Sequence, residues 1–436
     1  MSEKSNHFPT PIHDFLTEYA QSDTIRLHMP GGKGADFPLD ITEINGADVL
    51  YECSGIIRES ERNTAKLYGA AETCYSCGGS TLAIQAMLYA ACQRSGKRKI
   101  AAGRYSHKSL INTAILLGLD VNWIYPEEFL GCGLSPEAIG KAIDSDTGAV
   151  FVNSVDYLGG ECDIEAAARV CRKRGVPLLT DNAHGAYKVF TGGHPIALGA
   201  DMCADSAHKT LPALTGAAYL HLADSSYLAG AKAGMAMFGS SSPSYLILDS
   251  LDLCARYIAE QRDDALRAAE RVRELKARLT ADGIPLRQSD DMRITLDALS
   301  LGYTGYEAGQ FLRLHGAEPE MCDERYTVLL FSTVQPERDF AAVYDILRKI
   351  PRKAPLTCEN ETLLMPEKVL TPREAFFAPK ITVPSEPTYS EGRICAGVFS
   401  PCPPCVPIVM PGERISADAA HALVRYGVTN IDVVNE

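Results

Sequence analysis

Between residues 78 and 222 the sequence alternates short apolar runs with helical patterns, and this alternation restricts the possible folds most. The strand-like runs are KIAA (99–102), VNWIY (121–125), AVFVN (149–153), VPLLT (176–180) and AAYLHL (217–222). Each run is continuously apolar, which is typical of strands buried on both faces. Helical patterns fill the intervals at 81–93, 108–118, 135–143 and 163–175. The sequence therefore predicts an α/β fold whose mostly parallel sheet is covered by helices.

Two of these helices carry end signals. Ser135 followed by Pro136 suits an N-cap and a first helical position. Asp163 suits the N-cap of the next helix, and Gly175 suits the position just after its end. Both helices are therefore expected close to these bounds.

The chain has 436 residues, which is too many for one small core. We expect an irregular N-terminal segment at 1–50, a large domain at 51–285 and a smaller C-terminal α/β domain at 286–436. A long helical stretch from 243 to about 280 closes the large domain. The small domain is expected to contain strands at 292–296 and 326–333, helices at 306–316, 339–350 and 416–426, and a proline-rich loop region at 366–411.

The composition excludes several classes of partner. The formal net charge is −13, which argues against nucleic acid or an anionic membrane surface. No apolar run approaches the ~20 residues of a membrane span. The 14 cysteines occur without a secretion signal, so we expect a cytoplasmic protein with mostly free, buried thiols.

Three polar stretches fall at the expected carboxyl ends of strands, where open α/β sheets bind ligands. They are CGGST (77–81), TDNAHGAY (180–187) and DSAHKT (205–210). The first offers backbone N–H groups and hydroxyls at a helix start, as a phosphate site would, although such a stretch alone is more often a turn and cap. Asp181 is either a structural carboxylate or the partner of a cationic ligand nitrogen. Lys209 alone would be interpreted as a surface charge.

Together the three stretches match the requirements of pyridoxal phosphate (PLP). Its phosphate needs hydroxyls and a helix N-terminus, its pyridine nitrogen needs a carboxylate, and its aldehyde needs a lysine for a Schiff base. The order of these groups along the chain therefore indicates a PLP site with Lys209 as its covalent anchor.

The stretch DSAHKTLPALTGAAYLH, which begins at Asp205, strongly resembles the lysine motif of the bacterial ornithine/lysine/arginine decarboxylase family, PLP enzymes of the aspartate aminotransferase fold (fold type I). The resemblance covers most of the chain. Its other segments are LHMPGGKG (27–34), CGGST, GRYSHKS (103–109), TDNAHGAY, SSSPSYLILDSLD (240–252), PREAFFAPK (372–380) and GRICAGVFSPCPPCVPIVMPGE (392–413).

The resemblance implies a role for each matching residue. Lys209 would carry the cofactor, Asp181 would face the pyridine nitrogen, His107 would stack on the ring and His184 would lie beside it. The residues around the phosphate would be Gly79, Ser80, Thr81, Ser206 and His208. Ser242 or Ser244 would reach the cofactor of a neighbouring subunit, so the family implies at least a homodimer with shared active sites.

Several positions depart from the family pattern. Gly32 replaces a signature histidine, and Gly78 replaces an asparagine before Gly-Ser-Thr. NSVDYLG (153–159) and CPPC (402–405) replace a Pro-Thr-Tyr-x-Gly stretch and a Tyr-Pro-Pro-Gly stretch. Since these departures lie around the substrate, PLP binding is better supported than the identity of the substrate.

Two further motifs resemble sites of other kinds, but neither is interpreted as functional. GGKGAD (31–36) lacks the spacing and the preceding strand of a nucleotide-binding loop. The pairs Cys74/Cys77 and Cys402/Cys405 could bind zinc or act in redox chemistry, but coincidental thiols are expected and no metal ligand is predicted.

The predicted function is decarboxylation of a small cationic amino acid (lysine, arginine or ornithine) to an amine and CO2. Another PLP reaction, such as that of a lyase, aldolase or aminotransferase, is the alternative; a non-catalytic PLP-fold binding protein is the third possibility. The acidic stretch EPEMCDE (318–324) is where a carboxylate for the distal cation would be sought, with Glu320 and Asp323 as candidates against a solvated acidic turn.

Overall fold

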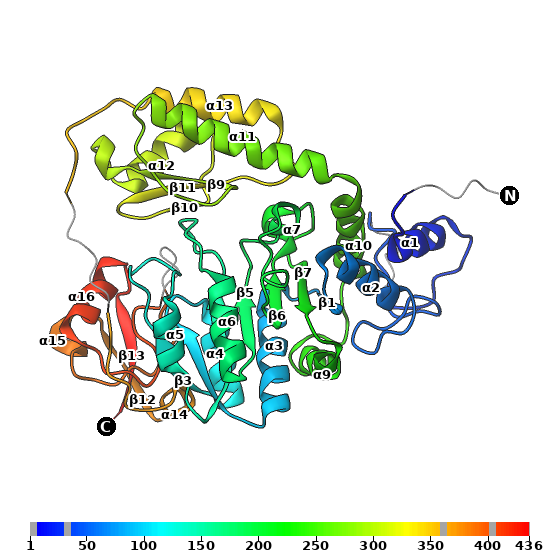
Figure 1. The fold of residues 1–436 in the computed structure, drawn as a ribbon, viewed down its shortest axis with the longest axis horizontal. Coiled ribbons are helices and arrows are strands. Elements are labelled where there is room, and N and C mark those ends of the chain that lie inside the picture. Colours follow the sequence, from blue (N-terminus) through cyan, green and yellow to red (C-terminus); the bar gives the residue numbers. More distant parts are fainter. Residues whose placement is uncertain (1–6, 30–35, 358–363, 401–406, 436) are drawn as a thin grey trace. The chain divides into compact units, whose positions relative to one another are not determined.

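The computed structural model describes residues 7–29, 36–357, 364–400 and 407–435 (Figure 1). The chain forms two compact units. The first comprises residues 1–96, 177–267 and 332–334, and the second comprises 97–176, 268–331 and 335–436. Each unit is described by itself. The predicted domain bounds at 50 and 285 remain predictions.

Seven strands follow one another in the order β1-β7-β6-β5-β4-β2-β3, which confirms the predicted α/β fold. The first unit contributes β1 (Glu72–Ser76), β5 (Leu178–Asp181), β6 (Met202–Asp205) and β7 (Ala218–Leu222). The second contributes β2 (Lys99–Gly103), β3 (Asp120–Ile124) and β4 (Thr147–Asn153). β2 pairs in parallel with β3 and β4, and β5 pairs in parallel with β6.

β7 is the antiparallel member of this order, and it lies between β1 and β6. Ser76, the last residue of β1, pairs with Ala218, and Asp205, the last residue of β6, pairs with Tyr219. The carboxyl ends of β1 and β6 therefore meet at the same edge, on either side of the start of β7.

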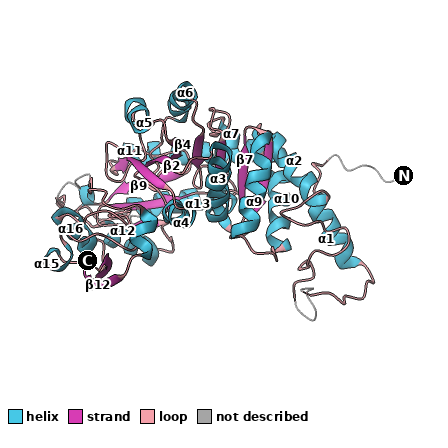
Figure 2. Cartoon of the chain, turned by 90° about the horizontal axis from the view of Figure 1, so that it is seen from below, coloured by secondary structure: helices cyan, strands magenta, loops and turns pink. Residues whose placement is uncertain are grey.

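In the first unit, the helices α2 (Ile56–Tyr68), α3 (Gly79–Ser95) and α9 (Leu228–Phe238) pack against strands of the sheet. α3 and α9 lie side by side (Figures 1 and 2). Shorter elements follow the strand ends: α7 (Lys188–Thr191), α8 (Ala207–Thr210) and a 3-10 turn at Ser225–Tyr227. The predicted helical stretch 243–280 is divided at Gln261 into α10 (Tyr245–Glu260) and α11 (Arg262–Ala281).

In the second unit, α4 (Lys108–Leu117), α5 (Pro136–Ala142) and α6 (Ile164–Arg174) follow β2, β3 and β4. The predicted end signals are confirmed. The Ser135 side chain accepts from Ala138 N, and the Asp163 side chain accepts from Ala166 N. Gly175 ends α6 in the left-handed conformation.

The expectation that residues 1–50 are irregular is wrong for α1 (Pro11–Gln21). Its buried residues Ile12 and Leu16 belong to the core of the first unit. Its first N–H groups are satisfied by a distant side chain, because Asp252 Oδ2 accepts from Ile12 N at 2.9 Å and from His13 N at 3.0 Å. The Thr10–Pro11 pair at the start of this helix is nevertheless a local signal, of the kind seen at Ser135–Pro136, and it was missed.

The second unit also holds the predicted smaller α/β part. Its antiparallel sheet has the order β10-β11-β9-β8. The elements are β8 (Leu286–Arg287), β9 (Arg293–Asp297), a 3-10 turn at Leu299–Leu301, α12 (Gly305–Leu314), β10 (Met321–Cys322), β11 (Tyr326–Leu330) and α13 (Glu337–Arg348). The proline-rich part holds α14 (Pro372–Phe377), β12 (Lys380–Pro384) and α15 (Pro387–Ser390), and α16 (Ala417–Arg425) precedes β13 (Asn430–Val434).

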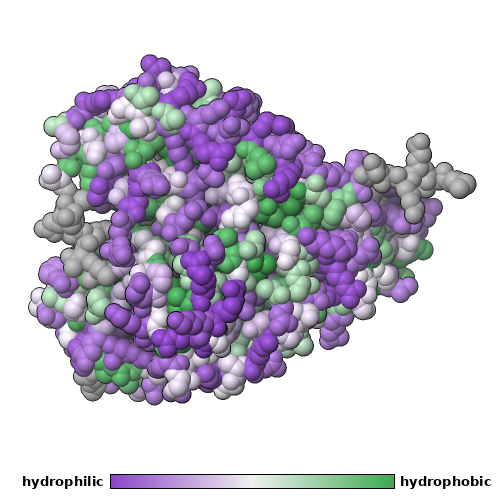
Figure 3. All heavy atoms as spheres, in the orientation of Figure 1, coloured by the Kyte–Doolittle hydropathy of each residue, from purple (hydrophilic) through white to green (hydrophobic). Residues whose placement is uncertain are grey.

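Hydrophilic side chains predominate on the face drawn in Figure 3. Among the described residues, none of the helices combines the length and the apolar character that crossing a bilayer requires.

Candidate active site

The carboxyl ends of β5 and β6 bring two predicted site residues together in the first unit. Lys209 lies in α8, directly after β6, and His184 lies in the turn after β5. The Lys209 ammonium donates to His184 Nε2 at 2.8 Å. This hydrogen bond places the imidazole proton on Nδ1. Lys209 is therefore half-buried and hydrogen-bonded within the protein.

Asp181 ends β5 and is 3 % exposed. Its Oδ1 accepts from Ala183 N at 3.0 Å. Burial raises the pKa of Asp181 to about 6, although the Ala183 N–H and the Lys209 charge act in the opposite direction. The site thus has a buried carboxylate whose charge a nearby cation would stabilise.

The predicted phosphate residues lie at the start of α3 and at the start of α8. Ser206 Oγ donates to Ser80 Oγ at 2.9 Å, so two hydroxyls from distant segments meet. Thr81 is exposed in the first turn of α3. The Gly79 N–H donates to Gly216 O at 2.8 Å and is thus already engaged within the protein.

His208 lies beside Lys209, but its ring is turned toward the backbone. Its Nδ1 donates to Ala217 O at 2.9 Å. The other ring nitrogen, Nε2, would have to carry a proton to donate to a phosphate. A phosphate role for His208 therefore requires the imidazolium form.

Ser242 and Ser244 lie near the start of α3 of the same chain. They line a hollow of about 350 Å³ together with Cys77, Gly78 and Thr81. Ser242 N donates to Ser240 Oγ at 3.1 Å, which shapes the bend before α10. The structure thus places Ser242 near the start of α3 of its own chain. Its role toward a neighbouring subunit remains a prediction.

His107 belongs to the second unit, where it is the N-cap of α4. Its Nδ1 accepts from Ser109 N at 3.2 Å, which leaves the proton on Nε2. The ring orientation is therefore fixed by the start of the helix. Stacking of this ring on the cofactor remains a prediction.

A buried cluster behind Asp181 was not anticipated from the sequence. Asp205, at the end of β6, is fully buried between His194 and His221. Tyr68 covers the cluster, and its ring stacks on that of His221 at a centroid distance of 4.0 Å. His194 and His221 do not stand at the spacing of a known motif, so the sequence did not indicate this cluster. The one available hint was an aspartate within a strand expected to be buried.

The departure at 153–159 forms a turn in the second unit that is also built around a buried carboxylate. Asp156 Oδ1 accepts from Gly160 N at 2.8 Å, and Asp156 Oδ2 accepts from Cys132 N at 3.2 Å. Burial raises the pKa of Asp156 to about 6. The sequence change therefore installs a carboxylate that closes this turn.

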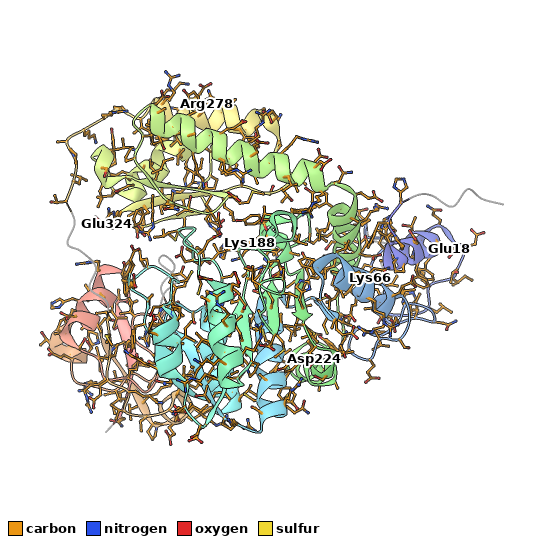
Figure 4. The ribbon with its side chains drawn as sticks, viewed as in Figure 1. Glu18, Lys66, Lys188, Asp224, Arg278 and Glu324 are labelled. Carbon is orange, nitrogen blue, oxygen red and sulfur yellow. The ribbon has the colours of Figure 1, made fainter. Side chains whose placement is uncertain are left out.

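Asp323 also serves a turn. Its Oδ1 accepts from Arg325 N at 2.8 Å and from Tyr326 N at 2.6 Å, between β10 and β11. Asp323 is 3 % exposed, and burial raises its pKa. Glu324, the next residue (Figure 4), and Glu320 are exposed. The proposed solvated acidic turn is thus wrong for Asp323, which lies in the interior.

Two sequence features fall partly outside the described residues. Gly32 and the pair Cys402/Cys405 are among the positions that the structure does not describe. Cys74 and Cys77 are described. Burial raises the pKa of both thiols to about 12.

The first unit fits PLP. Lys209 and Asp181 follow neighbouring strands, and the Ser80–Ser206 hydroxyl pair lies at the start of the 17-residue helix α3, where a phosphate is favoured. The raised pKa of Asp181 shows that this carboxylate is placed where burial alone destabilises its charge. A protonated pyridine nitrogen would compensate this cost.

Comparisons with known proteins agree with this site. Residues 5–294 match the family model described as Orn/Lys/Arg decarboxylase, major domain, and residues 359–430 match its C-terminal domain. The chain is 29 % identical to the Bacillus subtilis protein YaaO, an uncharacterized protein, over 95 % of this chain and 94 % of YaaO. It is 28 % identical to an arginine decarboxylase of Halalkalibacterium halodurans, over 93 % and 91 % of the two chains.

The fold is shared with solved structures at low sequence identity. The Francisella novicida lysine decarboxylase LdcF matches with a TM-score of 0.77 and 17 % identity, over 98 % of this chain and 81 % of LdcF. The Escherichia coli constitutive lysine decarboxylase also matches with a TM-score of 0.77, at 16 % identity, over 98 % and 82 % of the two chains.

Proposed function

The chain belongs to the Orn/Lys/Arg decarboxylase family, and on this premise we propose that it decarboxylates a cationic amino acid with PLP bound at Lys209. The observation that carries the proposal is the arrangement at the ends of β5 and β6. There Lys209 contacts His184 at 2.8 Å, and Asp181 is buried at the end of β5. This combination suits PLP chemistry on an amino acid.

PLP, when bound, supplies an electron-accepting ring that takes up the electron pair left on Cα as CO2 departs. The side chains of this protein bind and orient that group. The Ser80 hydroxyl, which accepts from Ser206, would donate to the phosphate, and Asp181 would accept from the protonated ring nitrogen. His184 Nε2 accepts a hydrogen bond from the Lys209 ammonium, and this contact orients the lysine amine.

The proposed substrates are arginine, lysine and ornithine, and arginine is the first to test because four curated relatives carry the name arginine decarboxylase. Recognition of the distal cation would need a carboxylate. The β10–β11 turn uses Asp323 Oδ1, but the buried Asp323 Oδ2 accepts no hydrogen bond from the described residues, so Asp323 and exposed Glu320 both stay candidates. Whichever of Asp323→Asn and Glu320→Gln removes the recognising carboxylate should lower kcat/KM for the cationic substrate by about 10- to 150-fold, the value of one charged hydrogen bond.

The test is product analysis with the purified, PLP-loaded protein. A panel of cationic, neutral and acidic amino acids is incubated with it, and CO2 and amine are measured. Equal amounts of CO2 and amine from a cationic amino acid are expected, and Lys209→Ala should release neither. CO2 from neutral or acidic amino acids alone, or consumption of substrate without CO2, would refute the proposal.

A further inference from the structure

The buried cluster behind the site contains Asp205, whose side chain is linked to the Asp181 turn. Asp205 Oδ1 accepts from Asn182 Nδ2 at 2.7 Å and from Cys203 Sγ at 3.4 Å. Its Oδ2 accepts from His194 Nε2 at 3.1 Å, and His221 Nε2 lies 3.5 Å from the same oxygen. Asp205 therefore has contacts from the turn after β5, from β6 itself, from β7 and from the segment before β6.

Asp205 is an anion in this cluster. His194 Nδ1 accepts from Ile196 N at 3.4 Å, so the His194 proton is on Nε2 and points at Asp205. Burial opposes the charge of Asp205, yet His194 and His221 hold its pKa far below the usual range. The atoms of Asp205, His194 and His221 that could ligate a metal lie within 4.8 Å of one another. The proton on His194 Nε2 favours a hydrogen-bonded cluster over metal ligation.

Asn182 connects this anion to the functional turn. Its N–H donates to Ala204 O at 2.9 Å, so both its backbone and its side chain are tied to β6. Gly185 N donates to Asn182 O at 2.8 Å, which closes the turn. A Cβ at Gly185 would overlap Asn182 Oδ1, so the turn is folded tightly around this amide. Asp181 precedes Asn182 and His184 lies within the turn.

We propose that Asp205 is a positioning residue that fixes, through Asn182, the Asp181 carboxylate and the His184 ring toward the cofactor. This inference rests on the proposed function, because it assigns the cluster to the PLP site. The Asp205 charge also favours a proton on the pyridine nitrogen over a neutral ring, since it adds negative potential behind Asp181. Loss of Asp205 should therefore reduce protonation of the ring nitrogen.

The test uses the full chain loaded with PLP that carries ¹⁵N in its ring. The variants are Asp205→Asn, which removes the charge at nearly constant volume, and Asn182→Ala, which removes the link but keeps Asp205. The matched control is Asp252→Asn, because Asp252 is also buried in the first unit but holds α1. The ¹⁵N chemical shift of the ring nitrogen, the Kd for PLP and kcat are measured for each.

Asp205→Asn and Asn182→Ala should both move the ring-nitrogen shift toward the unprotonated value and lower kcat by about 10- to 100-fold, the cost of a misplaced catalytic group. The double variant should lose less than the two single effects combined, since both changes act on the one contact between Asp205 and Asn182. Asp252→Asn should leave the shift unchanged. If Asp205→Asn does not fold, Asn182→Ala decides the question.

An unchanged ring-nitrogen shift in both variants would overturn the inference, as would an equal change in Asp252→Asn. The outcome for the proposed function is separate. If the wild-type chain releases no CO2 from any amino acid, the proposed function fails. If the wild type is active but the ring-nitrogen chemical shift does not change in Asp205→Asn and Asn182→Ala, only the positioning role fails.

Discussion

Two turns of this protein, one in each unit, are built around a buried carboxylate at the end of a strand. Asp181 begins the turn after β5, and Asp156 begins the turn that follows β4. Burial raises the pKa of each to about 6. Asp156 accepts backbone N–H groups with both oxygens, whereas Asp181 has the Lys209 charge nearby and the His184–Lys209 contact beside it.

The comparison shows that a raised pKa alone does not identify a functional carboxylate. In the Asp156 turn the hydrogen bonds go to Gly160 N and Cys132 N, which is what a structural clamp requires. In the Asp181 turn a lysine follows the neighbouring strand, and this pairing is what a PLP site requires. On the proposed function, Asp181 would serve the cofactor and Asp156 would hold its turn together.

Lys209→Ala tests the largest difference between the turns. The variant lacks the amine that anchors the cofactor, so turnover should fall below detection while the Ser80–Ser206 end can still retain PLP. Borohydride reduction of the wild type followed by peptide mapping should place the pyridoxyl group on Lys209. Its recovery on another lysine would contradict the assignment.

Asp181→Asn tests the functional carboxylate. At ~4 Å and an effective dielectric constant of ~20, its pair with the ring nitrogen is worth about 4 kcal/mol. If about half is expressed in the transition state, kcat should fall by roughly 30-fold. The rate is measured on fully PLP-loaded protein. An unchanged kcat would show that this turn resembles the Asp156 turn after all.

Asp156→Asn tests the structural carboxylate through pH. Because the pKa of Asp156 is raised on folding, its contribution to stability is fully present below about pH 4 and is lost as the pH rises through about 6. The unfolding free energy of the wild type relative to the variant should therefore be higher near pH 4 than at pH 7, by up to about 3 kcal/mol. Denaturant unfolding at both pH values measures the difference; an advantage that grows with pH would contradict the sign.

Two glycine substitutions give the smallest expected effects and compare the turns directly. A Cβ at Gly160 would overlap Asp156 Oδ2, and a Cβ at Gly185 would overlap Asn182 Oδ1. Each Ala variant should lose about 1–3 kcal/mol of unfolding free energy. Gly185→Ala should also lower kcat, whereas Gly160→Ala should keep it. A loss of kcat in both variants, measured on folded protein, would mean that both turns serve the site.

The sequence predicted much of this architecture because the buried strands are apolar. The runs at 99–102 and 149–153 coincide with β2 and β4, and the cap at Ser135 is present. β1 was not predicted, since Glu72–Ser76 is polar in sequence although its last four residues are buried. α1 was also not predicted, although Thr10 and Pro11 mark its start, because the glycine, proline and aspartate content of residues 1–50 favoured an irregular segment.

The site was predicted unevenly for a related reason. Lys209, Asp181 and Ser80 lie in local motifs that resemble a family, so each could be named from the sequence. Asp205, His194 and His221 act together only after β6 and β7 pair. Their spacing along the chain carries no periodicity that would have joined them. Contacts made by sheet pairing are therefore what the sequence concealed.

The antiparallel strand β7 has a consequence for how the chain folds. β7 comes last of the three strands along the chain and pairs with both β1 and β6. The Ser80–Ser206 contact joins residues that are 126 apart in sequence, and it lies at the ends of the two strands that β7 connects. Closing such long loops is slow compared with forming helices. A refolding chain should therefore regain its helical signal well before it can bind PLP. Cofactor uptake would then report the completed pairing of β7 with β1 and β6.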